Sequence, residues 1–325
     1  MQRLNRSIQA KEFSRLYLLY GEEQYLCRQY KDKLKSALCE DLSTMNIHHY
    51  EGKSIPIGEI IDLSETVPFF APRRVFILED TTLFAASGEQ MAEYVNSLPD
   101  TSTFIFVQKE VDKRTKLYKA IKNHGTITEF TIQDAQTLKQ WVASILKKDG
   151  LQIHEKTLEY FLEKTGSDMS TIRNELEKLI CYAVGNNVIT TDDIDAVCSV
   201  TVTNHIFDMI TTLAQKNQKL ALSLYEDLLA LKEPAMRILF LISRQCSLLL
   251  TVKELRAKGY GNKEIAAAIK LPPFVAGKYM TQSGQFTRER LEQAVRACVE
   301  AEEAVKTGRI QDRLSIEMLM LSVFT

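Results

Sequence analysis

The spacing of hydrophobic positions changes once along the chain. In the first third, short runs rich in β-branched and aromatic residues alternate with amphipathic segments that have helical spacing. The predicted strands are residues 16–20, 46–50, 74–78, 103–108 and 125–130, and the predicted helices are residues 24–38, 57–65, 88–97 and 113–123. Strands that alternate with helices of this length predict a mostly parallel α/β sheet.

From residue 134 onward the strand pattern disappears, and apolar residues recur every three or four positions almost to the end of the chain. Turn-forming residues divide this part into two groups of predicted helices. The first group has four helices over residues 135–203, and the second has five or six over residues 204–325. We therefore predict three domains: an α/β domain over residues 1–134 and the two helical domains that follow it.

The charge balance bears on possible partners. The 41 lysine and arginine residues nearly cancel the 42 aspartate and glutamate residues, so the net charge is -1. A chain of this kind has no global field that attracts nucleic acid or a membrane. We expect any nucleic acid to be bound together with partner proteins, and we expect no membrane partner.

The cysteines and the apolar segments favour a cytoplasmic protein. The six cysteines lie far apart, with no CxxC pair and no histidine nearby at ligand spacing, so we expect reduced thiols and no metal site. The N-terminal segment lacks the apolar region of a signal peptide. The most apolar stretch, residues 236–252, is interrupted by Arg237 and Arg244, which favours a buried bundle helix over a membrane span.

Residues 16–30, LYLLYGEEQYLCRQY, have the order of a phosphate-binding loop: an apolar strand, a glycine and an amphipathic helix. A working P-loop, G-x-x-x-x-G-K-[ST], needs its lysine to neutralise phosphate and its hydroxyl to hold magnesium. When the motif is aligned on Gly21, Leu26 stands at the second glycine, Cys27 at the lysine and Arg28 at the hydroxyl. We predict a degenerate P-loop that binds no nucleotide.

Other acidic residues support this interpretation. Glu22 and Glu23 bring negative charge to the place where phosphate would bind, and like charges at close range repel. Glu79 and Asp80 end an apolar strand where a nucleotidase would hold magnesium, but without a P-loop a charged strand end is the favoured interpretation. The chain has no GxSxG or HExxH motif and its histidines are scattered, so we expect no catalytic residue.

Several segments together resemble one family. They are YLLYGEEQYL, RRVFILED, FIFVQKEVDKRTKLYKAIKNHG, LKQWVASILKKDGLQI, GSDMSTIRNELEKLICYA, NHIFDMI, GYGNKEIAAAIKLPPFVAGKYM and EAEEAVKTGRIQDRLSIEMLML. The pattern covers nearly the full chain and resembles the delta subunit of the bacterial DNA polymerase III clamp loader, a relative of the AAA+ ATPases.

The resemblance implies an inactive AAA+ (RecA-like) module, a helical lid domain and a C-terminal helical collar domain that joins a hetero-pentamer. In this family, delta binds and opens the ring-shaped sliding clamp, the beta subunit, for loading onto primed DNA. The companion motor subunits hydrolyse ATP, and a delta-prime subunit completes the pentamer. The chain would then need no cofactor and be non-catalytic itself, although it belongs to a polymerase holoenzyme, which is a nucleotidyltransferase.

The resemblance also implies a clamp-binding site. In the family, a hydrophobic pair at a helix end of the first domain inserts into a pocket of the clamp. The matching stretch, ETVPFFAPRRVFIL, places Phe69 and Phe70 at the pair, and flanking prolines predict a short rigid turn. Without the resemblance, both rings would be expected to pack under the next strand. Val67 and Leu63 either complete the apolar patch or belong to the core.

Two other functions stay open from the residues. An AAA+ ATPase with an atypical P-loop would bind nucleotide in the isolated chain. A DNA-binding replication regulator would need a basic face and a salt-dependent affinity for DNA without partners. The local basic residues are interpreted as a solvated face, and none is assigned to DNA: Arg73, Arg74, Lys113, Arg114 and Lys116.

Overall fold

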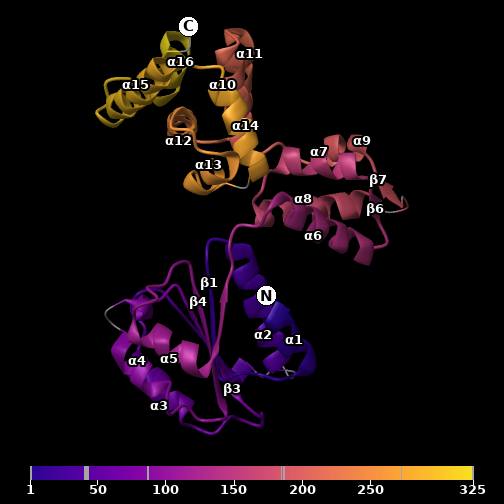
Figure 1. Cartoon of the computed structure of the whole chain (residues 1–325), viewed down its shortest axis with the longest axis vertical. Coiled ribbons are helices and arrows are strands. Elements are labelled where there is room, and N and C mark those ends of the chain that lie inside the picture. The colour runs from indigo at the N-terminus through magenta and orange to yellow at the C-terminus, as the bar shows by residue number, and fades with distance from the viewer. Residues whose placement is uncertain are drawn as a thin grey trace. The chain divides into compact units, whose positions relative to one another are not determined.

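The computed structural model describes residues 2–39, 44–85, 88–183, 185, 187–271 and 273–323. The chain divides into two compact units, Met1–Ile132 and Gln133–Thr325 (Figure 1). The further division of the second unit into a lid domain, residues 135–203, and a collar domain, residues 204–325, stays a prediction.

The first unit is built on a five-stranded parallel sheet with the order β2-β3-β4-β1-β5. Its strands are β1 (Leu16–Tyr20), β2 (Ile47–Glu51), β3 (Arg74–Glu79), β4 (Ser102–Gln108) and β5 (Thr126–Glu129). The three central strands are buried almost throughout, whereas β2 and β5 at the sides are partly exposed. A parallel sheet covered on both faces explains why the central strands are continuous hydrophobic runs.

Helices cover both faces of this sheet. They are α1 (Gln2–Ala10), α2 (Gln24–Leu38), α3 (Ile57–Ser64), α4 (Glu89–Tyr94) and α5 (Lys116–His124), with short 3-10 turns at Thr44–Asn46 and Thr82–Phe84. Figure 1 shows α1 and α2 on one side of the sheet and α3, α4 and α5 on the other. Phe76 and Phe104 face α3 to α5 and stack with ring centroids 4.7 Å apart. The predicted fold class is confirmed.

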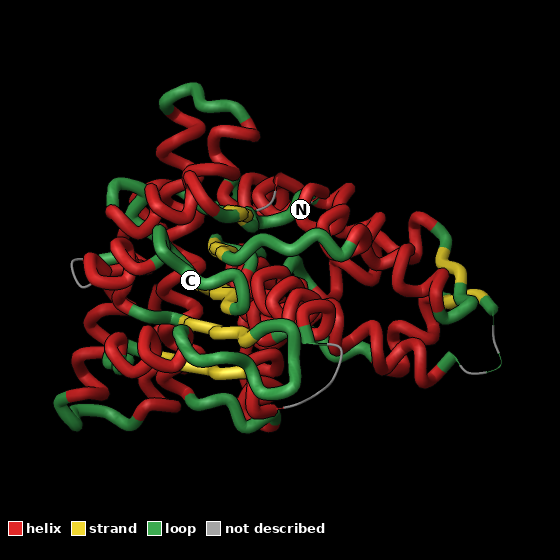
Figure 2. The backbone as a smooth tube through the Cα atoms, turned by 90° about the horizontal axis from the view of Figure 1, so that it is seen from below, coloured by secondary structure: helices red, strands yellow, loops and turns green. Residues whose placement is uncertain are grey.

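The second unit begins with four helices, as predicted: α6 (Ala135–Lys148), α7 (Glu155–Thr165), α8 (Met169–Tyr182) and α9 (Thr191–Val197). Two short strands, β6 (Gln152–Ile153) and β7 (Val188–Ile189), pair in parallel between them. Figure 2 shows this pair as two short yellow segments among red helices. The expectation that strands end before residue 134 was wrong, because a two-residue strand is too short to show alternation.

The remaining helices form a bundle. Among the described residues there are seven, rather than the five or six expected: α10 (Val202–Ala214), α11 (Gln218–Ala230), α12 (Ala235–Ala257), α13 (Asn262–Ala268), α14 (Pro273–Ser283), α15 (Arg288–Lys306) and α16 (Asp312–Val323). By length and composition alone, α12 could cross a membrane. Its buried residues Ile238, Ile242, Cys246 and Leu249 instead lie in the core of the bundle.

Candidate functional site

The strands of the first unit end at a carboxyl edge, formed by Tyr20, Glu79, Gln108 and Glu129, where open parallel sheets bind ligands. The glycine loop, residues 21–23, connects β1 to α2 at this edge. Gly21 has a φ of +134°, and a Cβ there would lie 2.2 Å from the carbonyl oxygen of Phe130. The loop therefore packs main chain against main chain, and only glycine fits.

Hydrogen bonds close the glycine loop. Phe130 N donates to Tyr20 O at 2.7 Å, and Glu23 N donates to Phe130 O at 3.1 Å. The Glu23 side chain is 8% exposed and accepts from Tyr25 N at 3.3 Å. The N-terminus of a helix attracts anions because its amides lack partners. At α2 a resident carboxylate already takes one of these amides.

The three residues at the P-loop positions have lost their chemical roles in different ways. Leu26 and Cys27 are buried in the core of the first unit, with exposures of 5% and 0%, and Arg28 is exposed. Burial, together with the charge of Glu23, raises the pKa of the Cys27 thiol to about 12. The position that would hold a lysine is thus an apolar packing position.

Glu79 at the same edge is paired with two side chains. Its Oε1 lies 2.7 Å from Lys31 Nζ and 2.8 Å from His49 Nε2. Burial raises the pKa of Glu79, but the hydrogen bonds from Lys31 and His49 outweigh burial and hold that pKa below its usual value. Within the described residues, no group of three His, Cys, Asp or Glu side chains is arranged to hold a metal ion.

The opposite, amino edge of the sheet carries the phenylalanine loop, residues 65–73, which joins α3 to β3. Phe69 is 51% exposed, Phe70 is 95% exposed and Val67 is 84% exposed. The two rings meet edge to face with centroids 4.7 Å apart. Leu63 packs partly against the core formed with α3 to α5. The loop displays the phenylalanine pair and Val67 to solvent, while Leu63 faces inward.

Arg74, which was interpreted as part of a solvated basic face, is 7% exposed, so that interpretation was wrong. Its guanidinium donates to Leu63 O at 2.6 Å, to Val67 O at 3.2 Å and to the Thr66 hydroxyl. It thereby satisfies one carbonyl in the last turn of α3 and one in the phenylalanine loop. The sequence carried one signal: Arg74 begins a strand that is otherwise apolar.

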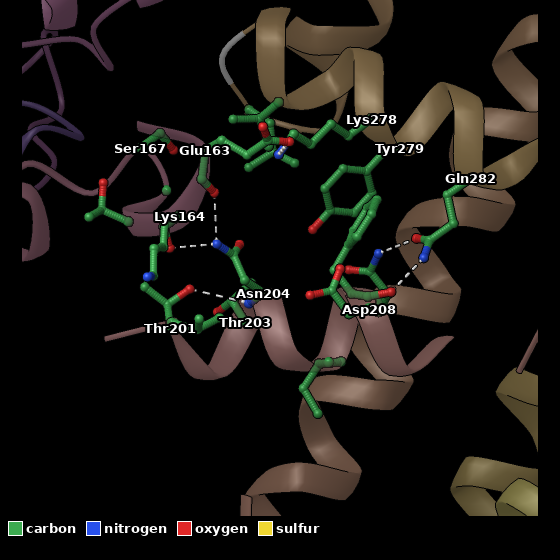
Figure 3. Close-up of a pocket in the computed structure, with 18 of the residues that line it drawn as sticks. Glu163, Lys164, Ser167, Thr201, Thr203, Asn204, Asp208, Lys278, Tyr279 and Gln282 are labelled. Carbon is green, nitrogen blue, oxygen red and sulfur yellow. Dashed lines mark hydrogen bonds and ion pairs between the residues drawn. The ribbon is translucent and has the colours of Figure 1, made fainter. Parts of the chain in front are cut away.

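The second unit has a cavity of about 1190 Å³ between α7, α8, α10, α12 and α14 (Figure 3). Lys278 Nζ on α14 lies 2.8 Å from a carboxylate oxygen of Glu163 on α7. The Asn204 amide donates to the main-chain oxygens of Glu163 at 2.9 Å and Lys164 at 2.8 Å. These interactions join the helices around the cavity.

Two family models match the chain. One, described as "DNA polymerase III, delta subunit", matches residues 17–131, and the other, described as "DNA polymerase III delta subunit, C-terminal domain", matches residues 203–323. The chain belongs to the DNA polymerase III delta subunit family. Both the glycine loop and the phenylalanine loop lie within the first matched segment.

Two curated relatives each span three quarters or more of this delta-family chain. The DNA polymerase III subunit delta of Bacillus subtilis (strain 168) is 25% identical over 332 residues, which cover 98% of this chain and 95% of the relative. A probable subunit delta of Aquifex aeolicus (strain VF5) is 26% identical over 258 residues, covering 75% and 72%. The solved structure titled Bacillus subtilis DNA clamp loader delta protein has a TM-score of 0.73 at 24% identity and covers 99% of both chains. This last similarity supports the fold.

Proposed function

We propose that this chain is the clamp-loader subunit that binds the ring-shaped sliding clamp, the beta subunit, and opens it for loading onto primed DNA in chromosome replication. Membership of the delta family supports this role. The observation that carries the proposal is the exposure of Phe69 and Phe70, at 51% and 95%, on the phenylalanine loop.

A contiguous patch of exposed apolar side chains on a folded chain commonly marks an interaction site. Phe69, Phe70 and Val67 come from one short loop and are its exposed large hydrophobic residues. An aromatic ring at the centre of an interface contributes about 2 kcal/mol or more when its partner pocket is dry. Two such rings would anchor the chain in an apolar pocket of the clamp.

Clamp opening requires more than binding. A ligand shifts a conformational equilibrium only by the difference between its affinities for the two states. The chain must therefore bind the open ring more tightly than the closed ring. We propose that the phenylalanine loop makes the contact that favours the open state.

The proposal assigns ATP hydrolysis to the motor subunits and no cofactor to this chain. The burial of Leu26 and Cys27 at the P-loop positions, and the Glu23 carboxylate at the start of α2, support that division. The chain would act in the cytoplasm, in a hetero-pentamer with motor and delta-prime subunits, and would contact primed DNA only within that complex. Leu314, Met318 and Leu321 form an exposed apolar stripe on α16, at helical spacing, which supports a subunit contact in the collar.

The test is clamp binding by the isolated chain without nucleotide. We expect the double substitution Phe69→Ala and Phe70→Ala to weaken the affinity about tenfold or more, since two anchoring rings are removed. The far-UV spectrum and the melting temperature should hardly change, because both rings are exposed in the free chain. Phe240→Ala removes a ring that is 64% exposed on α12 and should leave clamp affinity unchanged. An unaltered affinity of the double variant would contradict the proposal.

A further inference from the structure

The phenylalanine loop is held by a buried side chain from another part of the first unit. Asn46 ends the turn Thr44–Asn46 before β2 and is 1% exposed. Its Nδ2 donates to Phe69 O at 2.7 Å, and its Oδ1 accepts from Phe69 N at 2.8 Å. The side-chain amide of Asn46 thus hydrogen-bonds both the N–H and the carbonyl oxygen of Phe69, as a neighbouring strand would.

The next residue shows why this contact matters. Phe70 has a φ of +47°, in the left-handed region that bulky side chains rarely adopt. Such a conformation persists when the surrounding structure imposes it. Because the Phe70 side chain is 95% exposed, packing of its ring can contribute little. The main chain of Phe69, fixed by Asn46, therefore sets the direction of both rings.

Arg74 fixes the start of the same loop through the Thr66 hydroxyl and Val67 O, and it also bonds Leu63 O in the last turn of α3. Asn46 comes from the turn before β2 and Arg74 from the start of β3, so the loop is held against the sheet at its start and at the phenylalanine pair. A loop that is already fixed in its bound conformation loses less conformational entropy when it binds a partner. The rings can then be presented in one direction before any partner arrives.

We propose that Asn46 is a positioning residue for clamp binding. This inference rests on the proposed function: Asn46 holds Phe69 and Phe70 in the direction that enters the clamp pocket, and it acts through them. The inference predicts that a change at Asn46 alters both the order of the loop in the free chain and the affinity for the clamp.

The first measurement is amide hydrogen exchange at Phe69 in the full chain without clamp. The wild-type amide should be protected, and Asn46→Ala should speed its exchange about tenfold or more, because its acceptor is lost. Asn46→Asp keeps an acceptor for Phe69 N but loses the donor to Phe69 O, so protection should largely remain. Gln108→Ala is the control: Gln108 is 5% exposed and bonds Thr81 at the carboxyl edge.

The second measurement is the clamp affinity of the same variants. Asn46→Ala should weaken binding about tenfold, which is about 1.4 kcal/mol, and Asn46→Asp should fall between Asn46→Ala and the wild type. Gln108→Ala should bind as the wild type does. If the Ala variant does not fold, the clamp affinity of the Asp variant decides, and an affinity equal to that of the wild type would overturn the positioning role.

The outcomes separate the inference from the function. Continued protection of the Phe69 amide in Asn46→Ala, or full clamp affinity of that variant after protection is lost, would overturn the positioning role. Failure of the wild-type chain to bind the clamp would overturn the proposed function and, with it, the role of Asn46 in binding. The exchange experiment would then still decide whether Asn46 holds the loop.

Discussion

The glycine loop and the phenylalanine loop lie at opposite edges of the five-stranded sheet and differ in which side chains they expose. At the carboxyl edge, the glycine loop faces Phe130, and its polar groups pair with neighbours in the same chain. At the amino edge, Asn46 and Arg74 also satisfy the main chain, but there the apolar side chains are left outside. A connection becomes a candidate binding surface when its polar groups are satisfied internally and its apolar groups are not.

The largest effect is expected from a substitution that prevents the glycine loop from packing against Phe130. Gly21→Ala places a Cβ 2.2 Å from Phe130 O at a positive φ, so the main chains must separate. We expect the free energy of unfolding to fall by about 3 kcal/mol, measured by urea denaturation with circular dichroism. Gly52 has a φ of +93°, and a Cβ there would have no atom within 4 Å. Gly52→Ala should therefore lower the free energy of unfolding by only about 1 kcal/mol. Equal effects of the two substitutions would show that the loop is not closed as described.

Thiol reactivity tests, without a substitution, whether the carboxyl edge is closed around Cys27. Cys27 is buried, which raises its pKa to about 12, whereas Cys181 on α8 is exposed. Iodoacetamide at about pH 8 should modify Cys181 at least about 100-fold faster, since thiolates react and buried thiols stay protonated. Mass spectrometry of the peptides measures both rates. Equal rates, or a change at Cys27 when magnesium and ATP are added, would indicate a loop that opens for nucleotide.

The smallest expected effect concerns Glu79. Its pKa is lowered in the folded chain, so its contribution to stability is present above the unfolded value, about 4.3, and is lost as the pH falls through the folded value. Glu79→Gln should lower the free energy of unfolding by about 1 kcal/mol at neutral pH, because Lys31 and His49 lose a charged partner. The difference from the wild type should shrink below about pH 4.3.

The control for Glu79 is Glu89→Gln, which removes the partner of Lys116 in an exposed ion pair. We expect this substitution to leave the unfolding midpoint unchanged, because solvent screens such pairs. If both variants behave alike at neutral pH, the charged group at the carboxyl edge has no more structural importance than a surface pair.

The strands and main helices of the first unit could be predicted because each is specified locally. The predicted strand 16–20 and helix 24–38 coincide with β1 and α2, and the other predicted elements differ by a few residues at their ends. A local capping rule also holds in the second unit, where Thr287 caps α15 by accepting from Arg290 N. Hydrophobic period and capping residues act over a few positions, so they are visible in the sequence.

The missed features depend on contacts between distant segments. The β6–β7 pair joins Gln152 to Val188, and neither two-residue strand has a pattern of its own. Asn46 lies 23 residues before Phe69, and a lone asparagine before a strand gives no sign of its partner. The phenylalanine pair itself was found through the resemblance, since the residues alone favoured packing under the next strand.

By itself the sequence determined the class of the fold, the loss of the P-loop side chains and the family to which the chain is similar. Only the tertiary structure decided that Cys27 is buried, that Arg74 is internal and that Phe70 faces solvent in a left-handed conformation. The reason is physical. Local pattern sets which residues form an element, but burial and loop direction depend on hydrogen bonds and packing across the sheet, which join residues far apart in the chain.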